Sequence, residues 1–163
     1  MVDVAEVMAK PFAQRLLSEV PVLYLAYTGL DGGPRVIPVG YVWDGASFRF
    51  WTVPNAPKVR ALRADPRVAV TIDVLGAPPR LLLARGRAAL TVVDGVPDGY
   101  LEASHRTIPR EGWDDFDVQV RGLYDQMVAI TVRPDWAKLI DFETSVPVAL
   151  EEIVRERAQR GTP

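Results

Sequence analysis

Three cationic side chains, Lys58, Arg60 and Arg63, lie close together in the middle of the chain, directly after a predicted strand. The residues from 58 to 64 form a predicted short helix that follows the Pro-rich, strand-breaking segment 54–57. The start of a helix offers backbone N–H groups without helical partners, and a lysine beside them adds a compact positive charge. This spacing predicts a site for a phosphate or another small anion.

The charge of the chain is unevenly distributed around this segment. Between Arg35 and Arg87 there are nine Lys or Arg against three acids, Asp44, Asp65 and Asp73, which gives +6. Because the whole chain carries −2, the remainder must carry −8. A chain so acidic outside its centre is a poor candidate for non-specific nucleic-acid binding. The basic centre therefore indicates either an anion pocket or strand faces that arginines keep solvated.

Hydrophobic, β-prone runs separated by Asp-Gly turns must position these cations, and such turns predict hairpins. Pro38 cannot donate to a ladder, so we expect it at a sheet edge, at a bulge or facing a ligand. Phe48 and Phe50 alternate with Arg49 and Trp51, which indicates one strand face in the core. The predicted strands are 22–27, 35–43, 47–53, 67–74, 80–93, 127–132 and 137–142.

Helical spacing of apolar residues predicts flanking helices over 3–18, 58–64, 98–105, 114–125 and 148–159, with a kink or break at Pro11. The order of strands and helices favours a mainly β fold, a split antiparallel β-barrel of six to seven strands with flanking helices. We expect a single domain over 1–163. It divides into an N-terminal helix within 1–19, a barrel over 20–143 and a C-terminal helix over 147–160.

Several classes of protein are excluded or disfavoured. The chain has no cysteine, so disulfides, thiolate metal sites and cysteine nucleophiles are absent. No apolar run reaches the roughly 18 residues that span a bilayer, and the N-terminus has no basic secretory region. Neither a G-x-G-x-x-G nor a G-x-x-x-x-G-K-[ST] motif occurs. These features predict a cytoplasmic protein with no membrane or nucleic-acid partner.

Two blocks of residues carry a family resemblance. The first is Thr28-x-x-Asp31-Gly32-x-Pro34-Arg35-Val36-Ile37-Pro38-Val39. The second is Trp51-Thr52-x-Pro54, followed by Pro57-Lys58-Val59-Arg60-x-Leu62 and Asp65-Pro66-Arg67-Val68. Together they resemble the pyridoxamine 5'-phosphate oxidase-like, FMN-binding split-barrel family. Within it they most resemble the actinobacterial branch of flavin- and deazaflavin-dependent oxidoreductases, over about residues 20 to 143.

The resemblance implies a homodimer that holds its cofactor at the subunit interface. The cofactor would be FMN, with the deazaflavin coenzyme F420 as the alternative. The cofactor-binding residues would be Arg35, Val36, Ile37, Pro38 and Val39 beside the ring, Trp51, Thr52 and Val53 beside the ribityl chain, and Pro57, Lys58 and Arg60 at the phosphate. Lys58 would hold the phosphate, Arg60 and Arg35 would assist, and a partner strand near 80–85 would complete the pocket.

The function that follows is hydride transfer to or from a small organic substrate, with no catalytic side chain assigned. The C-terminal sequence lacks the basic residues that hold the substrate phosphate in pyridoxamine phosphate oxidases, so oxidation of vitamin B6 is not expected. One alternative is a non-catalytic protein that stores or senses a flavin or haem. Another is a structural dimer without a tight ligand.

The remaining reactive residue types give weaker signals. His105 is the only histidine, without a nucleophile motif around it, and is expected at a helix end. Asp114, Asp115 and Asp117 lack the spacing of a calcium loop, so no metal site is predicted and a helix start is favoured. Four late aromatic residues either line a substrate pocket or pack the late helices on the barrel: Trp113, Phe116, Tyr124 and Trp136.

Overall fold

The computed structural model describes residues 3–74, 76, 78–142 and 148–160. In this part of the chain seven antiparallel strands form one sheet with the order β2-β1-β5-β6-β7-β4-β3. The strands are β1 (Val22–Thr28), β2 (Pro34–Gly40), β3 (Val42–Trp43), β4 (Phe48–Thr52), β5 (Arg67–Val74), β6 (Arg80–Asp94) and β7 (Gln126–Asp141).

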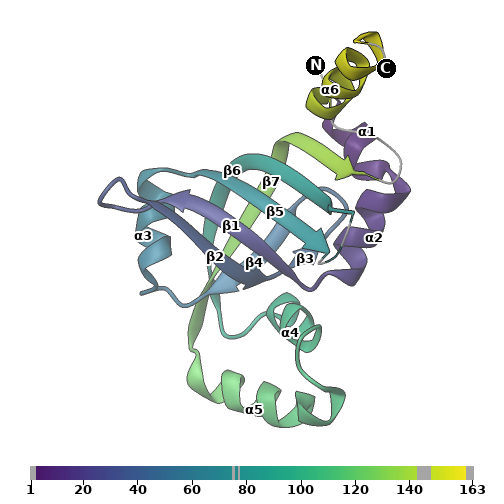
Figure 1. Cartoon of the computed structure of the whole chain (residues 1–163). Coiled ribbons are helices and arrows are strands. Elements are labelled where there is room, and N and C mark those ends of the chain that lie inside the picture. Colours follow the sequence, from purple (N-terminus) through teal and green to yellow (C-terminus); the bar gives the residue numbers. More distant parts are fainter. Residues whose placement is uncertain (1–2, 75, 77, 143–147, 161–163) are drawn as a thin grey trace.

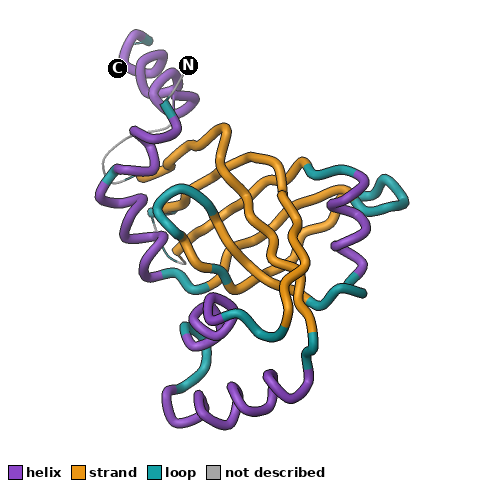
Figure 2. Tube along the Cα trace, turned by 180° about the vertical axis from the view of Figure 1, so that it is seen from behind, coloured by secondary structure: helices purple, strands orange, loops and turns teal. Residues whose placement is uncertain are grey.

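The sheet curls into a barrel with the helices arranged around it (Figures 1 and 2). The helices are α1 (Val4–Ala9), α2 (Pro11–Glu19), α3 (Pro57–Ala64), α4 (Asp98–His105), the short 3-10 helix η1 (Arg110–Gly112), α5 (Trp113–Leu123) and α6 (Val148–Gln159). The α4–α5 pair lies below the barrel in Figure 1, and α3 lies at its left end. This architecture confirms the predicted mainly β, split-barrel fold. None of the helices in the described residues is long and apolar enough to cross a bilayer.

Alternation along the strands places one face of each in the barrel interior. Phe48 and Phe50 are fully buried, whereas Arg49 is exposed and Trp51 lies outside the barrel wall, as the sequence predicts. Burial of these large side chains from water supplies the main driving force for closing the sheet. The same interior contains Leu23, Leu25, Val70, Ile72, Leu82 and Ile130.

The barrel is open between β2 and β4. Strand β2 pairs with β1 alone, and residues 50–52 of β4 pair with β7 alone, so each strand leaves one edge without a ladder partner in the described residues. Pro38 lies on β2 opposite Tyr24 of β1. Of the three positions expected for this proline, the sheet edge is the one observed, and the open edges leave backbone groups for a ligand.

Four predicted elements are divided or joined differently in the structure. The strand predicted over 35–43 is two strands, because the chain turns at Tyr41 to bury that side chain completely. The strands predicted over 127–132 and 137–142 are one strand, β7. The helix predicted over 3–18 is two helices separated at Lys10, which confirms the break expected at Pro11. Residue 147, the first of the predicted C-terminal helix, lies outside the described residues.

A β-bulge explains why β7 continues where two strands were expected. The register of β6 against β7 shifts between Arg85, opposite Trp136, and Gly86, opposite Pro134, so one extra residue on β7 is accommodated. The two strands can then stay paired along their whole length in spite of the proline. A single sequence gives no direct signal for such a bulge, because the pairing partner decides it.

We expect Gly86→Ala to lower the free energy of unfolding by about 1–3 kcal/mol. A Cβ at this position would lie 2.5 Å from the carbonyl oxygen of Arg133 and 3.1 Å from Val132 Cγ1. Urea unfolding measures the effect. Gly122→Ala in α5 is the control, since a Cβ there meets no described atom within 4 Å and helix propensity favours alanine. Equal stability of the two variants would contradict the steric argument.

Candidate functional site

Lys58 stands at the start of α3, beside one end of the open edge. Pro57 occupies the first turn, and the N-cap residue, Ala56, makes no side-chain hydrogen bond. Lys58 is half-buried, and burial lowers the pKa of its ammonium group. No hydrogen bond or ion pair joins it to another described residue. A desolvated cation without a partner among the described residues, at the start of a helix, favours an anionic ligand.

Arg35 lies close to the same helix end but already has a partner. Its guanidinium donates to Asp31 at 2.6 Å, and both side chains are substantially exposed. The backbone N–H of Gly33 and the Arg35 guanidinium lower the pKa of the Asp31 carboxyl. Arg35 and Pro57 line a common cavity of about 250 Å³. The structure thus brings Arg35 to the predicted phosphate end, with its charge partly offset by Asp31.

The other predicted cations differ in how available they are. Arg60 and Arg63 are exposed on α3, with no ion pair to another described residue. Arg67 forms two hydrogen bonds to Asp65, at 2.9 and 2.7 Å, which hold the pKa of that carboxyl at about 2. The charge of Arg67 is therefore engaged by Asp65 and is less available to a ligand.

The predicted ring-binding segment, residues 35–39, forms most of β2. Val36 and Pro38 are exposed, whereas Ile37 and Val39 are half-buried against the barrel core. Arg35 and Val39 are four residue steps apart, and at about 3.3 Å per step they lie roughly 13 Å apart along the strand. The segment therefore runs from the cationic end of the opening toward the helices α4 and α5.

The predicted ribityl-binding residues Trp51, Thr52 and Val53 do not share one orientation. The side chain of Thr52 is buried, so only its backbone is available at the edge. The carbonyl of Val53 accepts a hydrogen bond from Ala56 N–H at 3.1 Å, which turns the chain into α3. Trp51 lies outside the barrel with Arg49 over its ring at 5.5 Å. Of the three side chains, that of Trp51 reaches a cavity.

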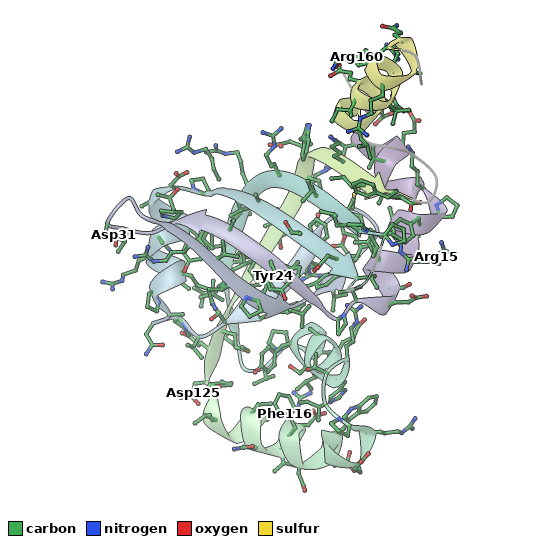
Figure 3. All side chains as sticks on the ribbon, viewed as in Figure 1. Arg15, Tyr24, Asp31, Phe116, Asp125 and Arg160 are labelled. Atoms are coloured by element: carbon green, nitrogen blue, oxygen red, sulfur yellow. The ribbon has the colours of Figure 1, made fainter. Side chains whose placement is uncertain are left out.

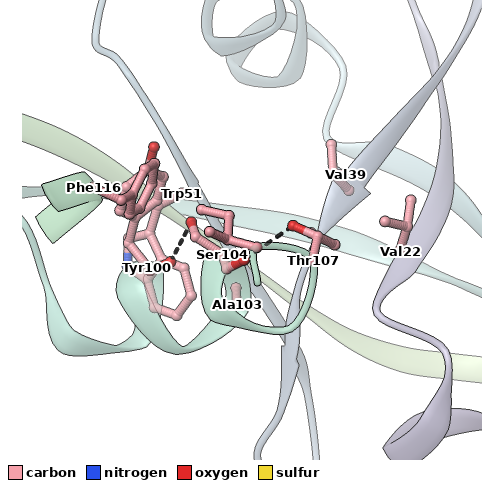
Figure 4. Close-up of a pocket in the computed structure, with 10 residues that line it drawn as sticks. Val22, Val39, Trp51, Tyr100, Ala103, Ser104, Thr107 and Phe116 are labelled. Carbon is pink, nitrogen blue, oxygen red and sulfur yellow. Dashed lines mark hydrogen bonds between the residues drawn. The ribbon is translucent and has the colours of Figure 1, made fainter. Parts of the chain in front are cut away.

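This second cavity, of about 370 Å³, lies at the far end of the opening (Figure 4). Val39 and Gly40 of β2, Trp51 of β4 and Val22 of β1 form its barrel side. The opening is thus bordered by a cationic site at one end and by an apolar cavity at the other. Two strand edges with unpaired backbone groups connect them.

The helical wall of this cavity comes from α4 and α5 and was not predicted, apart from Phe116. Tyr100 and Ser104 lie on α4, and Thr107 follows that helix. Tyr100 packs against Phe116 of α5 with ring centroids 6.2 Å apart and planes 25° apart. No local pattern marks these residues as ligand-contacting, because only tertiary packing brings the two helices against β4.

The other late residues form contacts between the helices. His105 Nε2 lies 2.7 Å from Asp117 Oδ1, and its ring stacks on Trp113 at 4.1 Å. Tyr124 packs against Tyr100. Trp136 lies on β7 beneath the Arg85 guanidinium, 4.1 Å away. Of the four aromatic residues considered as pocket residues, Phe116 lines the 370 Å³ cavity, where Figure 3 shows it between α5 and the barrel.

The opening fits an elongated cofactor with a phosphate at one end and a flat ring at the other. Lys58 and the start of α3 provide the anion site. The edge of β2 provides backbone donors and acceptors along roughly 13 Å. The apolar cavity adjoins Val39, where the ring end would lie. Residues 80–85, expected to complete a partner's site, lie on β6.

Comparisons with known proteins find solved structures that share this fold. A solved structure named F420 reductase is 28% identical, covers 77% of this chain and 94% of its own, and has a TM-score of 0.57. A conserved hypothetical protein from Mycobacterium tuberculosis is 20% identical with a TM-score of 0.61, covering 90% of each chain. HutZ, the haem storage protein from Vibrio cholerae, is 16% identical with a TM-score of 0.56, covering 80% of this chain and 93% of its own. The latter two demonstrate the shared fold alone.

Among curated proteins, no sequence matches the chain significantly. The family model described as pyridoxamine 5'-phosphate oxidase matches residues 9–122. The match covers more than half of the chain, from the second helix through the whole opening to α5. On this evidence the chain belongs to the pyridoxamine 5'-phosphate oxidase family.

Proposed function

We propose that the chain is a flavin- or deazaflavin-dependent oxidoreductase that transfers a hydride to or from a small organic substrate. In this proposal it is a cytoplasmic homodimer of the actinobacterial flavin/deazaflavin branch of its family. The observation that carries the proposal is Lys58, a half-buried cation without a described partner at a helix start, beside an open strand edge. The 28% identity to the protein named F420 reductase supports it.

The residues of the chain would bind and orient the cofactor. The ammonium group of Lys58 pairs with the phosphate, and the backbone N–H of the same residue, in the first turn of α3, can donate to it. The backbone of β2 between Arg35 and Val39 forms hydrogen bonds with the ring edge, because its outer edge has no strand partner. When bound, the reduced cofactor supplies a hydride with its two electrons, or the oxidised cofactor accepts one. No side chain is assigned as a proton donor, so the proton comes from or goes to water or the substrate.

An exposed apolar surface on the barrel supports the homodimer. Tyr24 is 45% exposed and Val36 65% exposed on neighbouring strands, and the exposed Pro38 lies opposite Tyr24. Figure 3 shows Tyr24 on the outer face of the sheet. Contiguous apolar surface of this kind is typical of an interaction site. In the dimer, residues 80–85 of the partner's β6 would close the cofactor site.

FMN is the first candidate cofactor, and F420 is the alternative. FMN needs one phosphate site, and Lys58 provides it. The longer anionic tail of F420 would need further cations, which Arg60 and Arg63 can supply because they are exposed on α3. Arg67 is less suited to this role, since Asp65 already binds its guanidinium. We do not propose oxidation of vitamin B6.

The alternative of a non-catalytic flavin- or haem-binding protein is less well supported. His105, the one histidine of the chain, would be the obvious axial ligand of a haem. Its Nε2 is instead engaged by Asp117, and its ring stacks on Trp113. Without a free imidazole, haem binding would need a different ligand.

Parallel fluorescence titrations of the purified, cofactor-free protein with FMN and with F420 test the cofactor site. We expect tight binding of one of them. Hydride transfer is then tested by mixing the reduced, bound cofactor with organic acceptors under anaerobic conditions, against free cofactor as the control. Binding without accelerated reoxidation would favour the storage or sensing function. Failure of both cofactors to bind below about 100 µM, roughly −5 kcal/mol, would reject the flavin site.

A further inference from the structure

The 370 Å³ cavity between the barrel and α4–α5 has an uncharged lining. All ten of its lining residues, within the described part of the chain, are uncharged. Its volume lies in the range of about 300–1,000 Å³ that is typical of small-molecule sites. Because a charged group loses hydration on burial, a cavity without a countercharge disfavours ionised ligands. The cationic end of the opening, by contrast, favours them.

Three aromatic side chains give the cavity its shape. Trp51 comes from β4, Tyr100 from α4 and Phe116 from α5 (Figure 4). They belong to a second apolar cluster, separate from the barrel core, that also includes Leu101 and Met127. Aromatic faces pack well against other planar rings and add to the free energy of apolar burial. The lining therefore favours a flat, conjugated molecule.

Two of the three hydroxyl groups in the lining, those of Ser104 and Thr107, already use their hydrogens, and the third is the Tyr100 phenol. Ser104 Oγ donates to the backbone carbonyl of Tyr100 at 2.8 Å, and Thr107 Oγ1 donates to the carbonyl of Ser104 at 3.0 Å. Each oxygen can then act only as an acceptor toward a ligand. These hydroxyls and three aromatic rings, with no cationic side chain among the lining residues, do not form a charge-paired site for a phosphate or a carboxylate.

We propose that this cavity binds the organic substrate of the enzyme and that the substrate is an uncharged, planar, conjugated molecule. The assignment as substrate rests on the proposed function, since Val39 belongs both to the cavity and to the segment proposed to bind the cofactor ring. A molecule in the cavity would therefore lie next to the ring end of the cofactor. The selectivity for uncharged rings rests on the lining itself.

Gly99 positions the tryptophan wall. A Cβ at Gly99 would overlap the Cη2 and Cζ2 atoms of the Trp51 indole, so the helix can approach β4 only with glycine here. Gly99 is thus a positioning residue for the cavity. Alanine at this place would displace the indole ring while still suiting the helix.

The test is a tryptophan-fluorescence titration of the cofactor-free, full-length protein with 1,4-naphthoquinone and with its 2-sulfonate. The chain has no cysteine, so the quinone cannot form thiol adducts. We expect the neutral quinone to bind at least about tenfold more tightly than the sulfonate, because the charged group would be buried unpaired. Phe116→Ala and Gly99→Ala should each weaken quinone binding roughly three- to tenfold. Val118→Ala, on the exposed face of α5, is the matched control and should leave it unchanged.

Cofactor binding by the same variants distinguishes a cavity that binds the substrate from a cavity that holds the cofactor. The inference predicts unchanged FMN or F420 affinity in Phe116→Ala, with weaker quinone binding. An equal loss of cofactor affinity would overturn it, because the cavity would then hold the cofactor itself. Equal binding of the quinone and its sulfonate, or quinone binding insensitive to Phe116→Ala and Gly99→Ala, would also overturn it. If neither cofactor binds the wild-type protein, the proposed function fails, while quinone selectivity still decides whether the cavity binds uncharged rings.

Discussion

Lys58→Ala is expected to weaken FMN binding about ten- to a hundredfold, the cost of losing one charged hydrogen bond. The fold should not change, because Lys58 makes no hydrogen bond or ion pair with another described residue. Isothermal titration with FMN measures the effect, with F420 replacing FMN if F420 is the cofactor that binds. Arg63→Gln, which removes an exposed cation from the same helix, is the matched control for FMN and should change FMN affinity less than about threefold; for F420 the control is Arg155→Gln on α6, which removes an exposed cation that has no proposed role in the site. Equal affinities of wild type and Lys58→Ala would remove Lys58 from the site.

The pH dependence of binding provides a second test of Lys58. Burial lowers the pKa of this lysine from its ordinary value of 10.5, so the group loses its proton at a lower pH than an exposed lysine does. FMN affinity should therefore fall as the pH rises toward 10.5, and Lys58→Arg should retain affinity over the same range. In the cofactor-free protein, a lowered lysine pKa means that the charged form opposes folding below that pKa. Lys58→Ala should consequently not lower the stability of the cofactor-free protein.

Arg106→Ala is expected to lower the free energy of unfolding by about 3 kcal/mol, among the larger effects of a single substitution. The guanidinium donates to four backbone carbonyls, those of Tyr41, Leu17, Ser18 and Val20, at 2.9 to 3.2 Å. Two of these carbonyls lie in the last turn of α2, which has no basic residue of its own. A cation at this negative helix end adds a favourable dipole interaction.

The same arginine fixes the position of the cavity wall. Arg106 follows α4 directly and lies over the ring of Tyr41, 5.0 Å away, at the corner where β2 ends. Burial raises the pKa of the Tyr41 phenol to about 12, so its hydroxyl remains a donor to the Leu17 carbonyl at 3.2 Å. Loss of this contact network would loosen α4 from the barrel, so substrate binding should weaken together with stability.

Urea unfolding followed by circular dichroism measures the effect of Arg106. Arg106→Lys should recover only part of the loss, because an ammonium group cannot reach four carbonyls in the geometry of a guanidinium. Arg155→Ala, an exposed arginine of α6, is the control and should change stability by less than about 0.5 kcal/mol. A destabilisation no larger than that of the control would show that the four carbonyls find other partners.

The elements that local sequence determines were predicted well. The strand over 67–74 and the helix over 98–105 have their predicted bounds, since alternation and helical spacing are local properties. The bulge opposite Gly86 and the turn at Tyr41 were missed, because each depends on a distant strand or helix. Pro38 was placed correctly at an edge, because the absence of an N–H restricts it in any fold.

The residues of the candidate site also divide into those that the sequence can predict and those that it cannot. Lys58 and Arg35 were predicted as site residues from charge, turns and the family resemblance, and the structure places Arg35 in one cavity with Pro57, the residue before Lys58. Tyr100, Ser104 and Gly99 could not be found, because they are ordinary residues of a short helix until α4 packs against β4. The engagement of Arg35 by Asp31 also became apparent only in three dimensions.

A crystal structure of the protein with its cofactor, FMN or F420, tests the central claim most directly. The account predicts the phosphate within hydrogen-bond distance of Lys58 Nζ, at the start of α3, and the ring beside the backbone between Arg35 and Val39. It also predicts that the cavity formed by Trp51, Tyr100 and Phe116 stays open next to the ring. A cofactor bound elsewhere, or a phosphate held away from Lys58, would contradict it.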